Sequence, residues 1–198
     1  MRVLIVNTSE KTGGAAVAAN RLMEALNNNG VKAKMLVRDK ATENITIASL
    51  PHSPLLQWHF LWERWRAFWH LHFSSVHLWE IDLACAGSDI TKLREFKEAD
   101  VIHLSWINQG MLSLKSIRKI IKSGKPIVWT MHDICPATGI CHYARGCNRY
   151  ASACGNCPLL PHKGSKHDIS NKVFRRKKEL YQHSNIYFVT CSKWLERQ

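Results

Sequence analysis

Residues 1–38, MRVLIVNTSEKTGGAAVAANRLMEALNNNGVKAKMLVR, carry the pattern of a β-α-β unit and decide the fold class. Residues 2–7 form a short run rich in Val and Ile, which is typical of a buried parallel strand. Residues 15–28 place Ala, Leu and Met at helical spacing, and the stretch NNNG at 27–30 ends that helix. Residues 32–38 supply the second strand.

The same alternation returns in the second half of the chain. Residues 100–106 (DVIHLSW) and 126–131 (PIVWTM) predict two strands, and residues 111–122 predict the helix between them. Residues 187–191 (YFVTC) predict a further strand, after which Ser192 caps the next helix. Strands that alternate with helices favour an α/β fold, a Rossmann-like open and mostly parallel sheet with helices on both faces.

Length and composition limit the class of protein. The chain has 198 residues and is 45% hydrophobic, which fits one globular domain and excludes disordered and fibrous proteins. We expect residues 1–198 to form that domain, with residues 132–170 as an inserted loop rich in Cys, Gly and Pro. No apolar run suits a transmembrane helix or a signal peptide, so we expect a cytoplasmic protein, peripheral to the inner face of the membrane if it contacts one.

The positive charge is confined to one half of the sequence. The formal net charge is +13, and residues 101–198 account for almost all of it, with 16 basic and 4 acidic side chains. Residues 1–100 are nearly balanced, with 12 basic and 11 acidic side chains. We therefore expect the second half to meet an anionic group or an acidic neighbour.

Four cysteines lie close together in the inserted loop. Their spacing is Cys141-x5-Cys147-x6-Cys154-x2-Cys157, and the last pair, with a glycine between its members, is spaced like two ligands that wrap one metal ion. Four thiolates predict a structural zinc site, and they leave no open position for a catalytic metal. Free thiols, disulfides and an iron–sulfur cluster remain as alternatives. Cys135 is a fifth thiol nearby.

Glycines and polar residues follow the predicted strands, at the edge where open α/β sheets bind ligands. Gly13 and Gly14 follow the first strand and would let backbone amides approach a phosphate or a sugar, unless they form only a tight turn. His132 is a candidate catalytic residue that would donate to a sugar hydroxyl or a phosphate, with Asp133 orienting it or accepting from a hydroxyl. A structural role for His132 in the cysteine loop is the alternative. Asn108 is a further candidate binding residue.

An aromatic segment at residues 54–73 predicts a helix with four tryptophans on one face, at spacing i, i+4, i+7 and i+11. These are Trp58, Trp62, Trp65 and Trp69. Tryptophan at this density suits a bilayer interface, and the alternative is burial against this domain or a neighbouring one. The basic run at 175–178 predicts a solvated helix face, which phospholipid headgroups, a diphosphate or nucleic acid would each suit.

Four segments together carry a family resemblance. They are RVLIVNTSEKTGGAAVAANRLMEAL, ADVIHLSWIN, GKPIVWTMHDICPATGICHYARGCNRYASACGNCPLL and FVTCSKWLE. They resemble the N-terminal half of family 4-type glycosyltransferases, retaining GT-B enzymes built from two Rossmann-like domains. The second and third segments resemble bacterial polysaccharide-building members that carry the same four-cysteine insertion. The similarity spans nearly the whole chain and is weakest in the aromatic segment.

The resemblance implies transfer of a sugar from a nucleotide-sugar to a hydroxyl of a saccharide, often a lipid-linked one. In such enzymes the N-terminal domain mainly binds the acceptor and the C-terminal domain binds the donor nucleotide. The resemblance implies that Gly13 and Gly14 approach the donor diphosphate across the cleft between the domains and that His132 contacts the transferring sugar. The leaving diphosphate is thought to take the acceptor proton, so no protein general base is implied. Ser105 stands where the family commonly has a second histidine.

The donor-binding C-terminal domain of that family has no counterpart in the 198 residues. We therefore expect the chain alone to lack transferase activity and the donor half to be missing or a separate polypeptide. The alternative function is a zinc-stapled basic module for nucleic acid or an anionic membrane. Nucleic acid is the weaker fit, because it leaves the β-α-β start and the glycine pair without a purpose.

Overall fold

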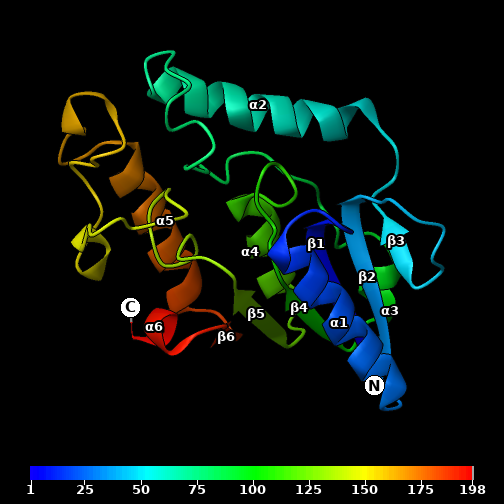
Figure 1. Cartoon of the computed structure of the whole chain (residues 1–198). Helices are drawn as coiled ribbons and strands as arrows, with labels where there is room; N and C mark the ends of the chain where they lie inside the picture. The colour runs from blue at the N-terminus through cyan, green and yellow to red at the C-terminus, as the bar shows by residue number, and fades with distance from the viewer. Residues whose placement is uncertain (198) are drawn as a thin grey trace.

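A computed structural model describes residues 1–197 and shows one open sheet of six parallel strands with helices packed around it (Figure 1). The sheet order is β3-β2-β1-β4-β5-β6. The strands are β1 Arg2–Ser9, β2 Lys32–Asp39, β3 Ile47–Ser49, β4 Val101–Leu104, β5 Ile127–Met131 and β6 Ile186–Thr190. The α-helices are α1 Gly14–Asn28, α2 Pro54–His70, α3 Arg94–Glu98, α4 Leu114–Lys122, α5 Ile169–Gln182 and α6 Lys193–Glu196. The predicted Rossmann-like α/β sheet is confirmed.

Helix capping sets two of the boundaries. The helix predicted over 111–122 begins only at Leu114, because the Ser113 hydroxyl accepts a hydrogen bond from the Ser116 amide at 3.1 Å and caps α4 there. The start of that prediction was wrong. Ser192 caps α6 as predicted, with its hydroxyl accepting an amide in the first turn at 3.2 Å.

The bounds of three elements could not be read from the sequence pattern. β3 has three residues and α3 has five, which is too short for a hydrophobic period to show. The third element, α5, contains the basic run at 175–178, of which Lys177 is buried while the other three side chains are exposed. The predicted solvated face is therefore confirmed for three of its four residues.

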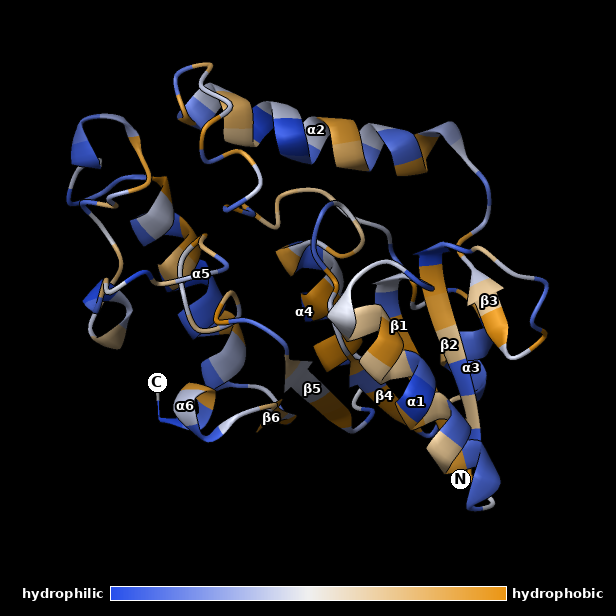
Figure 2. Cartoon of the chain, viewed as in Figure 1, coloured by the Kyte–Doolittle hydropathy of each residue, from blue (hydrophilic) through white to orange (hydrophobic). Residues whose placement is uncertain are grey.

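Two apolar layers cover the two faces of the sheet. On one face, Ile117 and Ile120 of α4 and Leu180 of α5 pack on strand residues such as Leu104. On the other face, α1 packs through Ala19 and Met23 on β1 and β2. Apolar residues accordingly concentrate in the strands between these helices (Figure 2). The packing confirms helices on both faces of the sheet.

Helix α2 runs across the carboxyl ends of the strands (Figure 1). A Cβ atom built on Gly110, in the loop after β4, would lie only 2.8 Å from the backbone nitrogen of Phe60 in α2. The guanidinium of Arg38, near the end of β2, lies over the Phe60 ring at 5.2 Å. None of the described helices is both long and apolar enough to cross a membrane.

The orientation of α2 is the reverse of an ordinary surface helix. Glu63 and Arg64 are buried, whereas the four tryptophans of the stripe are between 44% and 63% exposed. The four tryptophans do share one face, as predicted. Their burial against the rest of this chain, the alternative reading of the pattern, is wrong for the described residues.

The inserted loop is tied to the segment that follows α2. Ile81 and Cys141 form an isolated antiparallel bridge. Beside it, the Asp82 amide donates to the Ile140 carbonyl at 2.7 Å, and the His142 amide donates to the Glu80 carbonyl at 3.0 Å. The loop is thereby held beside the carboxyl edge of the sheet.

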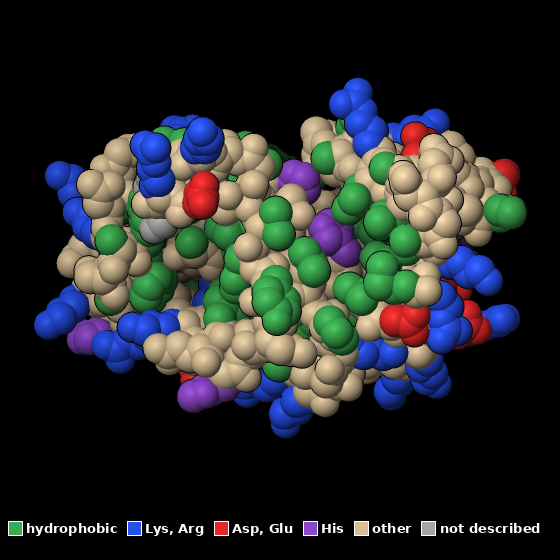
Figure 3. Space-filling model, turned by 90° about the horizontal axis from the view of Figure 1, so that it is seen from below, with side chains coloured by type: hydrophobic (Ala, Val, Ile, Leu, Met, Phe, Trp, Pro, Cys, Tyr) green, Lys and Arg blue, Asp and Glu red, His purple; other side chains and the backbone are tan. Residues whose placement is uncertain are grey.

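The sheet ends in β6, whose outer edge has no described strand beside it. Tyr187, Phe188 and Val189 on this strand are 69%, 41% and 46% exposed. The side of the molecule turned away from α2 shows apolar side chains in its middle and mostly Lys and Arg around its rim (Figure 3).

Candidate functional site

The carboxyl ends of β1 and β4 are locked together by hydrogen bonds. The Thr8 amide and hydroxyl both donate to the Trp106 carbonyl, at 2.8 and 3.0 Å. The Trp106 amide donates in turn to the Asn7 side-chain oxygen at 2.9 Å. These bonds fix the loops that follow the two strands, and with them the floor of the candidate site.

The glycine pair lies where the sequence predicts it, between β1 and α1. Gly13 has φ +87° and serves as the N-cap of α1 without a side-chain cap, and Gly14 is the first helical residue. Both are exposed, and a Cβ atom added at either would meet nothing within 4 Å. The first-turn amides and the positive end of the helix dipole therefore face open space, where an anion or a sugar can approach.

His132 follows β5 directly and contacts Ser105 at the end of β4. Its Nε2 lies 2.9 Å from the Ser105 hydroxyl. Burial lowers the pKa of His132, so the ring is neutral at pH 7 and one of its nitrogens carries a proton that it can donate. Two strand spacings, roughly 10 Å, separate β5 from the strand that carries the glycine pair.

A second histidine lies behind this pair within β4. His103 Nε2 is 2.9 Å from the Thr130 hydroxyl, and its Nδ1 is buried without a hydrogen-bond partner in the described residues. Burial, and then the neighbouring His132, lower the pKa of His103 to about 4. His103 is therefore a neutral residue of the sheet interior.

Asp133 is directed toward the cysteine loop. Its Oδ2 accepts from His142 Nδ1 at 2.8 Å and from Trp106 Nε1 at 3.0 Å, and its Oδ1 accepts from the Cys135 amide at 2.8 Å. Burial alone would raise the pKa of Asp133, but the bond from His142 and the other donors lower it below the ordinary value. No hydrogen bond joins Asp133 to His132 within residues 1–197, so this geometry gives Asp133 the role of organising the loop.

Asn108 lies in the loop after β4 and contacts Cys135. Its side-chain nitrogen is 3.4 Å from Cys135 Sγ, and it lines a cavity of about 20 Å³ together with Cys135, Lys177 and Tyr181. Lys177 Nζ donates to the Cys135 carbonyl at 2.7 Å. The structure thus places the half-buried Asn108 beside Cys135 at a small, mainly apolar cavity, and no hydrogen bond joins it to His132 within residues 1–197.

The four cysteines of the predicted zinc site surround one cavity. Cys141, Cys147, Cys154 and Cys157 all line a space of about 210 Å³, and no disulfide joins any cysteine of the described chain. The Gly139 amide points at Cys154 Sγ from 3.2 Å. Burial raises the pKa of Cys154 to about 11, so without a cation its thiol is neutral.

A different set of donor atoms is more tightly gathered. Within residues 1–197, Asp133, Cys135 and His142 are the set whose ligating atoms all lie within 4.8 Å of one another. The hydrogen bonds of Asp133 account for this proximity, and the Lys177 ammonium, 3.8 Å from Cys135 Sγ, opposes a cation there. The sequence pattern did not single out His142, because its partner Asp133 becomes a neighbour only when the loop folds back.

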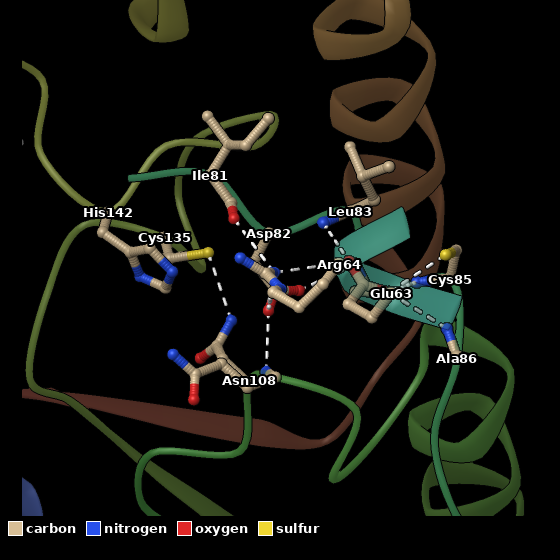
Figure 4. A network of polar contacts seen from close by, with 12 residues as sticks. Glu63, Arg64, Ile81, Asp82, Leu83, Cys85, Ala86, Asn108, Cys135 and His142 are labelled. Carbon is tan, nitrogen blue, oxygen red and sulfur yellow. Dashed lines mark hydrogen bonds and ion pairs between the residues drawn. The ribbon is translucent and has the colours of Figure 1, made fainter. Parts of the chain in front are cut away.

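Glu63, on the buried face of α2, accepts hydrogen bonds from backbone amides of residues 83–86 (Figure 4). Its Oε1 accepts from the Leu83 amide at 2.6 Å, and its Oε2 accepts from the Cys85 and Ala86 amides at 2.9 and 3.2 Å. Burial, and then the charge of Asp82, raise the pKa of Glu63. The four nitrogen and sulfur donors around the carboxylate nevertheless suit its ionised, acceptor-only form.

Arg64 completes this network and links it to the edge of the sheet (Figure 4). It donates to the Leu78 and Ile81 carbonyls at 2.6 and 3.1 Å and lies 3.5 Å from Asp82 Oδ2. The same Asp82 oxygen accepts from the Gln109 amide, in the loop after β4, at 2.7 Å. The position of α2 is thus coupled through buried charges to a loop of the candidate site.

Comparison with known proteins finds a similarity over part of the chain. No family model and no solved structure matches the chain. The chain is 30% identical over 89 residues to the protein named "Putative colanic acid biosynthesis glycosyl transferase WcaC" of Escherichia coli strain K12. The match covers 41% of this chain and 22% of that protein, so the chain spans about a fifth of its relative. The similarity supports a relationship with glycosyltransferases.

Proposed function

We propose that this chain forms the acceptor-side half of a retaining glycosyltransferase of GT-B architecture. The reaction moves a sugar from a nucleotide-sugar to a hydroxyl of a saccharide or of a lipid-linked saccharide. The observation that carries the proposal is the His132–Ser105 pair at the carboxyl ends of β5 and β4, on the same sheet edge as the glycine loop. The relationship with a glycosyltransferase supports it.

The residues at this edge suit hydroxyl groups and one anionic group. A neutral His132 and the Ser105 hydroxyl provide donors and acceptors that match a sugar. The open N-terminus of α1 at Gly13 and Gly14 provides backbone amides for a diphosphate. Catalysis then consists of positioning the two substrates and stabilising charge as the glycosidic bond to the diphosphate breaks.

The donor nucleotide requires further protein groups in this proposal. Arg38, a cation close to the edge, is already bonded to the Asp39 carboxylate and to the Gln109 carbonyl. We place the donor-binding groups on a second domain, as the family resemblance implies. The prediction that residues 1–198 lack transferase activity by themselves belongs to this proposal.

Saccharide binding tests the acceptor role directly. We would record saturation-transfer NMR spectra of the chain with bacterial oligosaccharides, for the unchanged protein, for His132→Ala and for His183→Ala. His183 is an exposed histidine at the end of α5 and serves as the matched control. Transfer that is lost in His132→Ala and kept in His183→Ala is expected, whereas equal transfer in all three would refute the site.

The same preparation tests the nucleic-acid alternative. The alternative predicts steeply salt-dependent binding of random oligonucleotides, because binding would release counterions from phosphates. Oligonucleotide binding at physiological ionic strength, together with no saturation transfer to any saccharide, would refute the glycosyltransferase proposal in favour of the nucleic-acid alternative. Oligonucleotide binding that vanishes at that ionic strength would leave it in place.

We also propose a structural zinc ion held by Cys141, Cys147, Cys154 and Cys157. The four thiols supply the donor atoms of such a site, since they line one cavity and are free of disulfides, and the loop must draw their sulfurs together, because within residues 1–197 no three of them lie within 4.8 Å of one another. The ion would tie together a loop that contains only two short 3-10 helices of three residues each. It would leave no position for a substrate and takes no part in the proposed transfer.

Elemental analysis of protein purified without added metal tests the zinc site. One equivalent is expected for the unchanged chain and for Cys191→Ser, an exposed control thiol outside the loop. Cys154→Ser/Cys157→Ser should retain less than about a tenth of the metal, because two of four ligands are removed. Metal-free wild-type protein with an unchanged melting temperature after chelation would refute the site.

A further inference from the structure

We propose that the outward face of α2 docks on an anionic lipid bilayer. This face, called the tryptophan face below, comprises Leu55, Trp58, Leu61, Trp62, Trp65 and Trp69, which are all between 44% and 63% exposed. The proposal concerns membrane attachment and does not depend on the transfer reaction.

The helix is fixed with its tryptophans pointing away from the protein. Glu63 and Arg64 on the opposite face are held by hydrogen bonds to backbone groups of residues 78–86. Rotating α2 to bury the tryptophans would therefore expose two ion-paired groups and break these bonds. The exposure of the tryptophan face is thus built into the packing of α2.

The segment after α2 extends the same apolar surface. Phe73 is 56% exposed and its ring lies 6.3 Å from that of Trp65 and 5.4 Å from that of Trp69. His72 and Phe73 have φ of 50° and 64°, a conformation that costs a bulky residue energy. The strained turn returns an aromatic ring to the tryptophans, so the surface is continuous beyond the end of the helix.

The shape and the chemistry of this surface suit a bilayer interface. An open groove of about 600 Å³ on this surface is lined by Trp58, Trp62 and Trp65 together with Leu61 and Phe68. Tryptophan has an apolar ring with one N–H donor, and this combination is favoured at the boundary between acyl chains and headgroups. A helix of 17 residues, roughly 25 Å long, can lie in that plane with its apolar face immersed.

Positive charge at one end of the tryptophan face indicates that the bilayer is anionic. Burial, and then the charges of Arg66 and Lys172, lower the pKa of His70 at the end of α2, so both cations lie close to that end of the helix. The His72 ring lies 6.3 Å from the ring of His162 in the cysteine loop. Arg66 of α2 and Lys172 of α5 thus bring positive charge to the C-terminal end of the tryptophan face, where it would meet lipid phosphates.

Vesicle flotation tests the proposal. Vesicles of phosphatidylcholine alone, and of phosphatidylcholine with about a third phosphatidylglycerol, would be mixed with the unchanged chain, with Trp62→Ser/Trp65→Ser and with Tyr187→Ser. Tyr187 is an exposed aromatic residue on β6 and controls for the loss of any surface ring. The double variant should lose on the order of tenfold or more in partition to the anionic vesicles, and the control should lose none.

A charge variant tests the second part of the proposal. Arg66→Gln/Lys172→Gln should bind anionic vesicles more weakly and neutral vesicles unchanged, because only the phosphate contacts are removed. Quenching of tryptophan fluorescence by brominated lipids would confirm that the rings enter the interface.

Two results would overturn the proposal. One is equal flotation of the unchanged chain and the double tryptophan variant, with circular dichroism showing that both are folded. The other is a chain that stays with neither vesicle and forms a dimer that Trp62→Ser/Trp65→Ser abolishes, since a second copy would then cover the tryptophan face. Neither result changes the saturation transfer to saccharides that the NMR experiment measures. Failure of the membrane proposal can therefore be distinguished from failure of the proposed function.

Discussion

Replacing Glu63 by alanine should be among the most destabilising single changes in this chain. Glu63 is fully buried, and its two oxygens accept the amides of Leu83, Cys85 and Ala86 at 2.6 to 3.2 Å. Alanine removes the acceptor of three backbone donors, of which those of Leu83 and Ala86 are buried. The expected loss is one of folding stability. Glu63 lies in α2, whereas the segment that it holds, residues 83–86, follows later in the chain.

The magnitude follows from those three donors. An unpartnered buried donor costs about 1–3 kcal/mol, and some water will enter the space left by the side chain. Removing a carboxylate whose pKa is raised by burial and by Asp82 recovers part of the cost. We expect a net loss of about 3 kcal/mol for Glu63→Ala. Glu63→Gln keeps one acceptor but turns an amide NH₂ toward a donor, so it should lose about 1–2 kcal/mol.

Urea denaturation followed by circular dichroism measures both variants. Glu179→Ala is the matched control, because the Glu179 side chain is 72% exposed on α5, and its stability should change by less than about 0.5 kcal/mol. A Glu63→Ala variant that loses less than about 1 kcal/mol, with an unchanged denaturant slope, would refute the argument that this carboxylate holds the segment.

Three further predictions concern pH and backbone geometry. The pKa of His103 is about 4 in the folded chain and 6.5 in the unfolded chain, so folding stability should be lost as the pH falls from 6.5 toward 4. In urea melts at pH 7 and pH 4.5, His103→Gln should remove about 2 kcal/mol of that loss. The hydrogen bond from Lys119 lowers the pKa of Asp89 from 3.8 to about 2, so its contribution is present above pH 3.8 and lost as the pH falls toward 2. Asp89→Asn should cost about 1 kcal/mol at pH 7 and flatten the acid melt in that window, and a steeper melt would contradict the assignment. Gly110→Ala should cost at least about 2 kcal/mol in thermal melts, because it combines φ +80° with a clash against α2, whereas Gly124→Ala at φ +74° has open space and should cost about 1 kcal/mol.

The strands and helices whose hydrophobic pattern extends over several residues could be predicted from the sequence. Apolar runs identified β1, β2, β5 and β6 within one or two residues, because a buried parallel strand leaves a continuous Val- and Ile-rich segment. The start of α4 was misplaced, since Met111 and Leu112 continue an apolar pattern although Ser113 caps the helix after them. Local capping chemistry outweighed hydrophobic spacing there.

The positions of the candidate site could be predicted better than its partners. The glycine pair and His132 lie at the ends of β1 and β5 because parallel strands bring their carboxyl ends to one edge. The partners of Asp133 and Asn108 could not be foreseen, since His142 and Cys135 reach them only after the loop folds back. Spacing along the chain carries no information about such contacts.

The orientation of α2 could not be predicted for a similar reason. The hydrophobic pattern alone leaves two orientations open, with the tryptophans facing the protein interior or facing a bilayer. The choice depends on the backbone of residues 78–86, which offers amides to Glu63 and carbonyls to Arg64. A helix whose charged pair satisfies so many buried backbone groups gains more from facing inward than its tryptophans lose by facing outward.

The two edge strands of the sheet, β3 and β6, differ in how readily they would pair with a strand of another molecule at high protein concentration. β3 offers a partner strand only three residues of edge, whereas β6 offers five, with Tyr187, Phe188 and Val189 exposed beside a row of backbone groups. Such an edge is a template for strand addition, and it lacks the lysines and prolines that usually discourage it. Concentrated solutions of this chain should therefore associate through β6 first, and a lysine at position 187 or 189 is the simplest way to keep the protein monomeric for the binding experiments.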